Sequence, residues 1–183
     1  MLIKLIRAAG VLLLFVAANA HGQAYKTLTV NDFRGVPHKT NFAAVAYTNC
    51  TISYNYAVRR DRGVFILDFN VKLQMNNNMS WIDHKRITSP EMLAEVLRHE
   101  QGHYIIAYLQ QQELLRTFGR TLFGRDYNMV ATNIFNRIDA KYSKMNTTYE
   151  KETNHMQNRD QQVSWDRYLA RCVEYMPPLV ANN

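Results

Sequence analysis

The sequence lacks the features typical of several domains, of a membrane-spanning segment after residue 20, and of a nucleic-acid-binding surface. It contains no internal repeat, low-complexity tract or linker, so the roughly 160 residues after residue 20 are expected to form one domain. The densest basic group, Arg59-Arg60-Asp61-Arg62, has no further stripe of cations or aromatic platforms around it, which excludes a nucleic-acid surface. After residue 20 no apolar run is long enough to cross a bilayer.

Cysteine is also scarce, with 2 residues, Cys50 and Cys172. In an oxidising compartment an even number permits one intramolecular disulfide. Because it would close a long loop, this bond would stabilise the fold by roughly 4–5 kcal/mol in the chain-entropy model. Cys50 falls on the apolar phase of a predicted strand and Cys172 on the apolar face of the last predicted helix. Two separate buried thiols are therefore the alternative.

The start of the chain has the plan of a secretory signal peptide. Two cations precede an apolar run over residues 8–20, and Ala18-Asn19-Ala20 is a small-residue cleavage site. A second cleavage site follows Ala24. The run is too short to span a bilayer, and no cysteine follows it that could carry a lipid. We therefore expect an exported protein, periplasmic or extracellular, with residues 21–183 as its single mature domain and a net charge reduced from +7 to +5 by the loss of both cations.

The first part of the mature chain has the period of β-strands. Apolar residues alternate with polar ones over residues 44–58 and again over residues 65–75. Residues 59–63, a short segment with aspartate and glycine, join the two runs, which predicts an antiparallel hairpin. Residues 28–33 are expected to form a short strand or the lead-in to one.

The rest of the chain has the period of helices. Ser89-Pro90-Glu91 provides an N-cap, a proline suited to the first turn and an acid near the positive end of the helix dipole. This helix is expected to end near Gly119. Apolar spacing predicts a second helix over residues 129–145 and a third over residues 163–176. The predicted fold class is α+β, with a small antiparallel sheet packed on a bundle of helices.

The most specific motif lies in the first of these helices. His99-Glu100-Gln101-Gly102-His103 has the pattern H-E-x-x-H, in a chain with only 6 histidines. Residues four apart on a helix lie one turn above each other on the same face, so both imidazoles can reach one zinc ion. Glu100 would then stand beside the zinc-bound water as general base. A helix that carries this motif makes the predicted fold zincin-like, and Gly102 within it is compatible with the close approach of another group.

Two histidines do not complete a catalytic zinc site, which takes three protein ligands. The extension H-E-x-x-H-x-x-G-x-x-H is excluded, because Ile106 and Leu109 occupy its glycine and last histidine positions. The third ligand must come from farther along the chain. His155 lies just after the second predicted helix has returned past the first. The competing carboxylates are Glu152, Glu150 and Asp139.

Two stretches are specific enough to indicate a family, H-E-Q-G-H at residues 99–103 and Y-x-x-E-T-x-H at residues 149–155. In these, the chain resembles a bacterial family of predicted secreted zinc-dependent proteases, otherwise catalogued as a domain of unknown function. Weaker matches run through the mature chain at residues 30–37, 43–44, 80–81 and 162–165. The resemblance implies His155 as the third zinc ligand, with Glu152 next.

These predictions describe a zinc metalloprotease acting on a peptide or protein substrate. His99, His103 and His155 would hold Zn²⁺, and Glu100 would take a proton from the metal-bound water and pass one to the leaving amine. Tyr149 is a candidate for steadying the developing oxyanion, with a purely structural role in the core as the alternative. Two other functions stay open: a non-catalytic zinc-binding envelope module, and a zinc amidase or peptidase that acts on cell-wall peptides.

Overall fold

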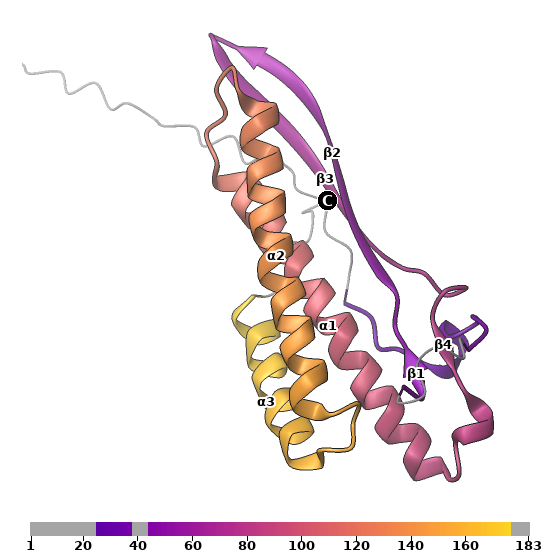
Figure 1. Cartoon of the computed structure of the whole chain (residues 1–183). Coiled ribbons are helices and arrows are strands. Elements are labelled where there is room, and N and C mark those ends of the chain that lie inside the picture. Colours follow the sequence, from indigo (N-terminus) through magenta and orange to yellow (C-terminus); the bar gives the residue numbers. More distant parts are fainter. Residues whose placement is uncertain (1–24, 38–43, 177–183) are drawn as a thin grey trace, which may run out of the picture.

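Within residues 25–37 and 44–176, which the computed structural model describes, the chain forms a long hairpin, a small second sheet and three long helices (Figure 1). The signal-peptide prediction for residues 1–20, with its second site after Ala24, lies outside the described residues. This architecture confirms the α+β class. In chain order the elements are η1 (Val30–Asp32), β1 (Ala46–Tyr47), β2 (Cys50–Asp61), β3 (Val64–Met75), β4 (Trp81–Ile82), η2 (His84–Arg86), α1 (Pro90–Arg120), α2 (Tyr127–Thr153) and α3 (Arg159–Tyr175).

The hairpin of β2 and β3 is antiparallel, as predicted, and longer than expected. Its register runs from Cys50 opposite Met75 to Asp61 opposite Val64. The turn therefore consists of Arg62 and Gly63 alone, which both have positive φ, 46° and 87°. Two residues with positive φ form the tight turn that matches the twist of paired strands. The charged residues before this turn remain in the ladder, so the predicted loop over residues 59–63 was too long.

Helix α1 lies between the hairpin and the other two helices. On one side it packs against the apolar face of β3, where Phe69 stacks on Phe118 with ring centroids 3.9 Å apart. On its other side it contacts α2 and α3 (Figure 1). Packing of the motif helix against the sheet is thus confirmed. The buried side chains between these layers include Leu67, Val71 and Leu114.

The second sheet pairs two-residue strands, with Ala46 opposite Ile82. The single strand predicted over residues 44–58 is thus divided into β1 and β2. At the break, the backbone N–H of Asn49 donates to Ser80 Oγ (2.9 Å) and not to a neighbouring strand. The strand expected over residues 28–33 is wrong as well. That segment contains the 3₁₀-helix η1, because the Asp32 carboxylate accepts the backbone N–H and the hydroxyl of Thr29 and closes a turn.

Helix α1 begins at its predicted cap, whereas α2 and α3 begin two and four residues before the predicted residues 129 and 163. Ser89 Oγ accepts the backbone N–H of Met92 (3.2 Å), and α1 runs to Arg120, one residue past the predicted end. Helix α2 was predicted too short, since it continues to Thr153 with Tyr149 and Thr153 fully buried.

Among the described residues, none of the helices is long and apolar enough to cross a membrane.

The two cysteines are free and only partly buried. Cys50 packs beside the apolar cluster that contains Leu73 and Tyr104, whereas Cys172 packs beside the cluster that contains Leu169. The structure therefore has two separate thiols and no disulfide between Cys50 and Cys172.

Candidate metal centre

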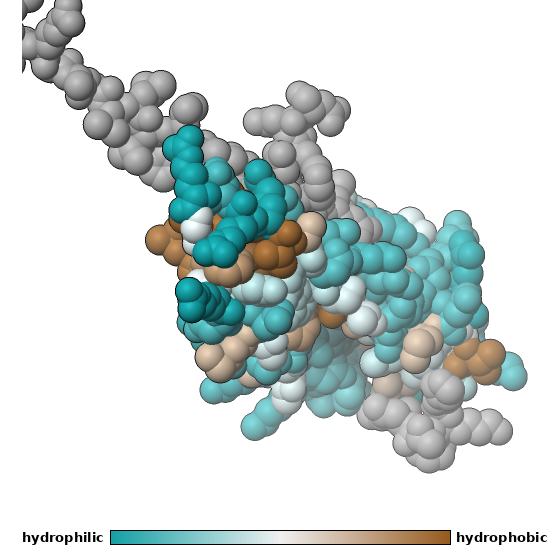
Figure 2. All heavy atoms as spheres, turned by 90° about the horizontal axis from the view of Figure 1, so that it is seen from above, coloured by the Kyte–Doolittle hydropathy of each residue, from teal (hydrophilic) through white to brown (hydrophobic). Residues whose placement is uncertain are grey.

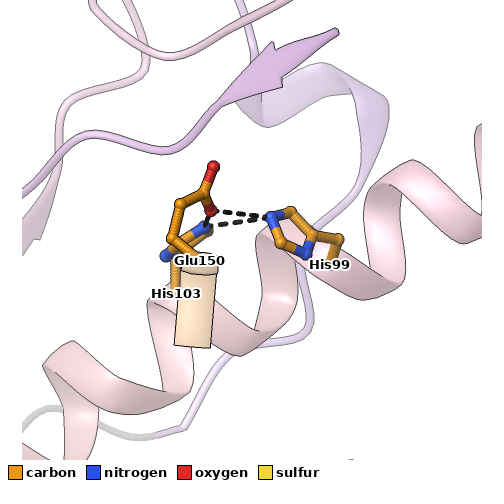
Figure 3. Close-up of side chains that lie close together, drawn as sticks. All are labelled: His99, His103 and Glu150. Carbon is orange, nitrogen blue, oxygen red and sulfur yellow. Dashed lines mark hydrogen bonds and ion pairs between the residues drawn. The ribbon is translucent and has the colours of Figure 1, made fainter. Parts of the chain in front are cut away.

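Three ligand atoms from two helices converge on one point (Figure 3). His99 and His103 lie one turn apart on α1, and Glu150 reaches them from the last turns of α2. The two Nε2 atoms are 3.2 Å apart, and Glu150 Oε2 lies 3.1 Å from His99 Nε2 and 3.0 Å from His103 Nε2. The H-E-x-x-H spacing thus brings both imidazoles to the same place, as expected.

The outer nitrogens of both rings face hydrogen-bond acceptors. His99 Nδ1 lies 3.0 Å from Gln162 Oε1, and His103 Nδ1 lies 2.7 Å from Asn146 Oδ1. The Gln162 amide is oriented by its NH₂ group, which donates to Asp166 Oδ1 (2.8 Å), an atom that only accepts when the carboxyl is ionised. This contact assigns the proton of a neutral His99 ring to Nδ1, and the Asn146 oxygen favours the same tautomer of His103, which leaves a lone pair on each Nε2.

Two imidazole lone pairs and a carboxylate oxygen at this separation repel one another unless a cation or proton lies between them. Zinc at 2.0–2.1 Å from tetrahedral ligands would separate them by about 3.3–3.4 Å. The observed separations of 3.0–3.2 Å are close to that spacing. Imidazole nitrogens with a carboxylate oxygen form a donor set that zinc prefers. These residues therefore fit a zinc ion.

The protonation equilibria of the cluster follow from this convergence. Burial opposes charge on His103, but Glu150, Glu100 and the Asn146 amide outweigh it and raise the pKa of His103. Burial likewise opposes charge on Glu150, but hydrogen bonds to His103 and His99 hold the pKa of Glu150 well below its usual range. Both directions favour the charged forms, a protonated His103 and an ionised Glu150.

Glu100 lies beside the cluster with an unsatisfied oxygen. Its side chain is 3% exposed, and its Oε2 atom has no hydrogen-bond partner among the described residues. A buried carboxylate oxygen without a partner is costly, so such a group requires an explanation. Glu100, His99, His103 and Glu150 all line a cavity of about 460 Å³, within the range of small-molecule sites. Glu100 thus lies in the wall of the cavity beside the histidines, with one oxygen that no described residue satisfies.

Tyr149 lies in the core behind the cluster. Its side chain is fully buried, and its hydroxyl donates to the backbone carbonyl of His99 (2.9 Å) and accepts from Gln162 Nε2 (2.9 Å). Burial raises the pKa of Tyr149 well above its usual value. The close contact anticipated at Gly102 is this phenol, because a Cβ at Gly102 would lie 2.5 Å from Tyr149 Cζ and overlap its hydroxyl. The tyrosine is not among the residues that line the cavity.

His155 is placed next to Glu150 rather than among the three converging atoms. Its Nδ1 forms an ion-pair contact with Glu150 Oε1, the oxygen that faces away from His99 and His103. It belongs to a turn in which Asn154, His155 and Met156 all have positive φ, 47°, 51° and 71°. Left-handed conformations cost non-glycine residues energy, so the turn must be held by its surroundings.

The other two carboxylates considered from the sequence do not reach the histidines, although Asp139 lines the same cavity. Glu152 is exposed and accepts a hydrogen bond from Trp165 Nε1 (2.8 Å). Asp139 accepts one from Gln110 Nε2 (2.9 Å), and 11 residues separate it from Glu150 along α2, a rise of about 16 Å. Of the three rivals to His155, the structure brings only Glu150 to the histidines of α1.

Two residues of the site carried no predicted role, Asn146 and Gln162. The signal for Asn146 and Glu150 was present, because the apolar spacing of the second helix continues from Tyr142 to Tyr149 at intervals of three and four residues. Extending the helix over that interval would have placed Asn146 and Glu150 on neighbouring turns. Gln162 comes from α3, and no local pattern indicates its contact with His99.

Fold and site together define a class: an α+β protein in which two helices present a partly buried His-His-Glu cluster suited to a metal ion. The chain belongs to a family described as bacterial protein of unknown function (DUF922), which it matches over residues 21–157. The match includes the motif and Glu150, and it confirms the resemblance to a bacterial family of unknown function. No curated protein and no solved structure matches the chain.

Proposed function

We propose that the protein is an exported zinc metallohydrolase that cleaves peptide bonds, with His99, His103 and Glu150 as the zinc ligands. The observation that carries the proposal is the convergence of their three ligand atoms at 3.0–3.2 Å, with both Nδ1 atoms committed to acceptors. The motif helix packed on a sheet supports a zincin-like arrangement. Glu150 replaces His155 as the proposed third ligand, because α2 carries it to the histidines.

The metal would supply a Lewis acid that polarises a substrate carbonyl and lowers the pKa of a bound water from 15.7 to about 7. Glu100 would act as general base, since it lines the same cavity as His99 and His103 and one of its oxygens has no hydrogen-bond partner among the described residues. It would hold the proton taken from water and donate it to the leaving amine.

Neighbouring residues would orient the ligands. Gln162 and Asn146 accept the Nδ1 protons and thereby fix each ring with its Nε2 toward the metal. His155 holds the outer oxygen of Glu150, which leaves the inner oxygen for the metal. Tyr149 would be a positioning residue, because its hydroxyl binds the His99 carbonyl and Gln162 and does not line the cavity.

The test measures the zinc content of the purified exported protein and its hydrolysis of amide substrates. We expect one zinc per chain and cleavage of casein-like or peptide substrates. The Glu100→Gln variant should retain its zinc and lose about 10²–10⁴-fold in rate, because only the proton transfer is removed. If the protein holds zinc but cleaves no peptide and no murein substrate, it is a non-catalytic zinc-binding module and the proposal is wrong. Cleavage of purified murein alone would make the enzyme a cell-wall hydrolase.

A further inference from the structure

The end of the β2–β3 hairpin projects past the helices and is exposed on both faces (Figure 1). Nearer the other end of β2, exposed residues alternate with half-buried ones, but residues 57–64 are all exposed. These exposed residues of the hairpin end contribute little to the core. Their composition is therefore free to serve another purpose.

Apolar side chains lie exposed at this end of the molecule. Val58 and Val64 are 42% and 54% exposed, and Leu122, in the loop between α1 and α2, is 94% exposed. An isolated bridge between Phe65 and Phe123 joins the hairpin to that loop, which brings Leu122 close to the strands. We call Val58, Val64 and Leu122 the apolar tip. By the register of the hairpin, Val58 lies on the face that carries Leu67 and Val64 on the opposite face with Asp61, so both faces of the hairpin end carry an exposed apolar side chain.

Arginines surround the apolar tip. Arg59, Arg60 and Arg62 lie on the hairpin, Arg120 ends α1, and Arg125 lies in the following loop; all five are exposed. Figure 2 views this end of the molecule and shows hydrophobic atoms gathered between strongly hydrophilic ones. The acids of the same segments are Asp61, Asp126 and Asp68, which pairs with Arg59 (3.4 Å), so the five arginines still outnumber them.

We propose that this hairpin end, the apolar tip with its arginines, docks on an anionic lipid bilayer. Arginines attract anionic headgroups, each strengthening binding by roughly fivefold near such a surface. The apolar side chains find a non-aqueous phase in the bilayer, whereas a soluble polyanion would leave them in water. His99 lies 21 residues before Arg120 on α1, about 30 Å away along the axis, so docking would leave the candidate metal centre accessible. The proposal is independent of the proposed hydrolase activity.

The test is binding to phosphatidylcholine vesicles with and without phosphatidylglycerol. We expect binding only when phosphatidylglycerol is present, and weakening by added salt. Replacing the three hairpin arginines together (Arg59→Gln, Arg60→Gln, Arg62→Gln) should weaken it on the order of 100-fold. The pair Val64→Ser and Leu122→Ser should weaken it about 10-fold or more, because their apolar surface no longer enters the bilayer.

Matched controls change the same residue types elsewhere. The exposed arginines of α2 and α3 (Arg137→Gln, Arg167→Gln, Arg171→Gln) remove equal charge, and Val36→Ser changes a valine that is 77% exposed. Both should bind like the wild type. The wild type and all variants must begin at the same residue, which intact-mass measurement checks before binding is compared. Equal binding to neutral vesicles, or full binding by either tip variant, would overturn the proposal; loss in the arginine variant alone would indicate a soluble polyanion instead.

Discussion

Among single side chains, Glu150 is the proposed metal ligand, and Glu152, two residues away, is a glutamate outside the cluster that serves as its control. Glu150 touches both Nε2 atoms, whereas Glu152 is exposed and binds Trp165. We expect Glu150→Gln to weaken zinc binding by at least about 100-fold, more than the loss of an orienting partner costs. Glu152→Gln should change it by less than about twofold, since it lies outside the cluster. Competition with a fluorescent zinc chelator measures both constants.

The same titration tests the earlier assignment of His155. Because His155 contacts only the outer oxygen of Glu150, its removal should leave the zinc stoichiometry at one. A chain that loses its zinc on His155→Ala and keeps it on Glu150→Gln would restore His155 as the third ligand.

For the helices, the close packing of α1 on α2 depends on Gly102. A Cβ there would overlap the Tyr149 hydroxyl, and both groups are held in a fully buried interface. Gly102→Ala should therefore lower the free energy of unfolding by about 1–3 kcal/mol, the usual cost of overpacking. Chemical denaturation measures the change.

Gly119 on the same helix is the matched control, because a Cβ there meets nothing within 4 Å. Gly119→Ala should be neutral or stabilising by up to about 1 kcal/mol, as alanine favours helix over glycine. Equal effects at the two glycines would contradict the packing assigned to Tyr149.

The elements also show how far local pattern predicts this fold. Alternation predicted the β2–β3 hairpin, and the Ser89 cap with the apolar spacing of α1 predicted the motif helix within one residue at its end. The end of α2 was missed, since Asn146, Thr147 and Thr148 are polar and conceal the spacing that Tyr149 continues. The four-residue spacing alone thus predicted that His99 and His103 share one face of the helix. The third partner depended on how far the next helix runs.

Contacts between distant segments could not be predicted at all. Gln162 reaches His99 across 63 residues, and nothing local to Gln162 indicates that contact. The interruption of the first strand likewise depends on Ser80, which accepts the Asn49 N–H from 31 residues away. Both are polar contacts that tertiary packing brings together, whereas the patterns of the sequence report burial and local hydrogen bonding.

At the scale of the whole molecule, two free thiols replace the expected disulfide. Burial, and secondarily Glu100, raises the pKa of the Cys50 thiol to about 12. The thiolate is the reactive form, so iodoacetamide at about pH 8 should leave Cys50 unmodified in the native protein. In denaturant both Cys50 and Cys172 should be alkylated, as intact mass would show. Failure of both to react in denaturant without a reductant would instead demonstrate the Cys50–Cys172 disulfide.

The central claim concerns one metal ion held between α1 and α2. Anomalous X-ray diffraction at the zinc edge, on crystals of protein never exposed to chelator, locates such an ion directly. We expect one peak at roughly 2.0–2.2 Å from His99 Nε2, His103 Nε2 and a Glu150 oxygen. The absence of a peak there, or a peak bound by other residues, would contradict the account.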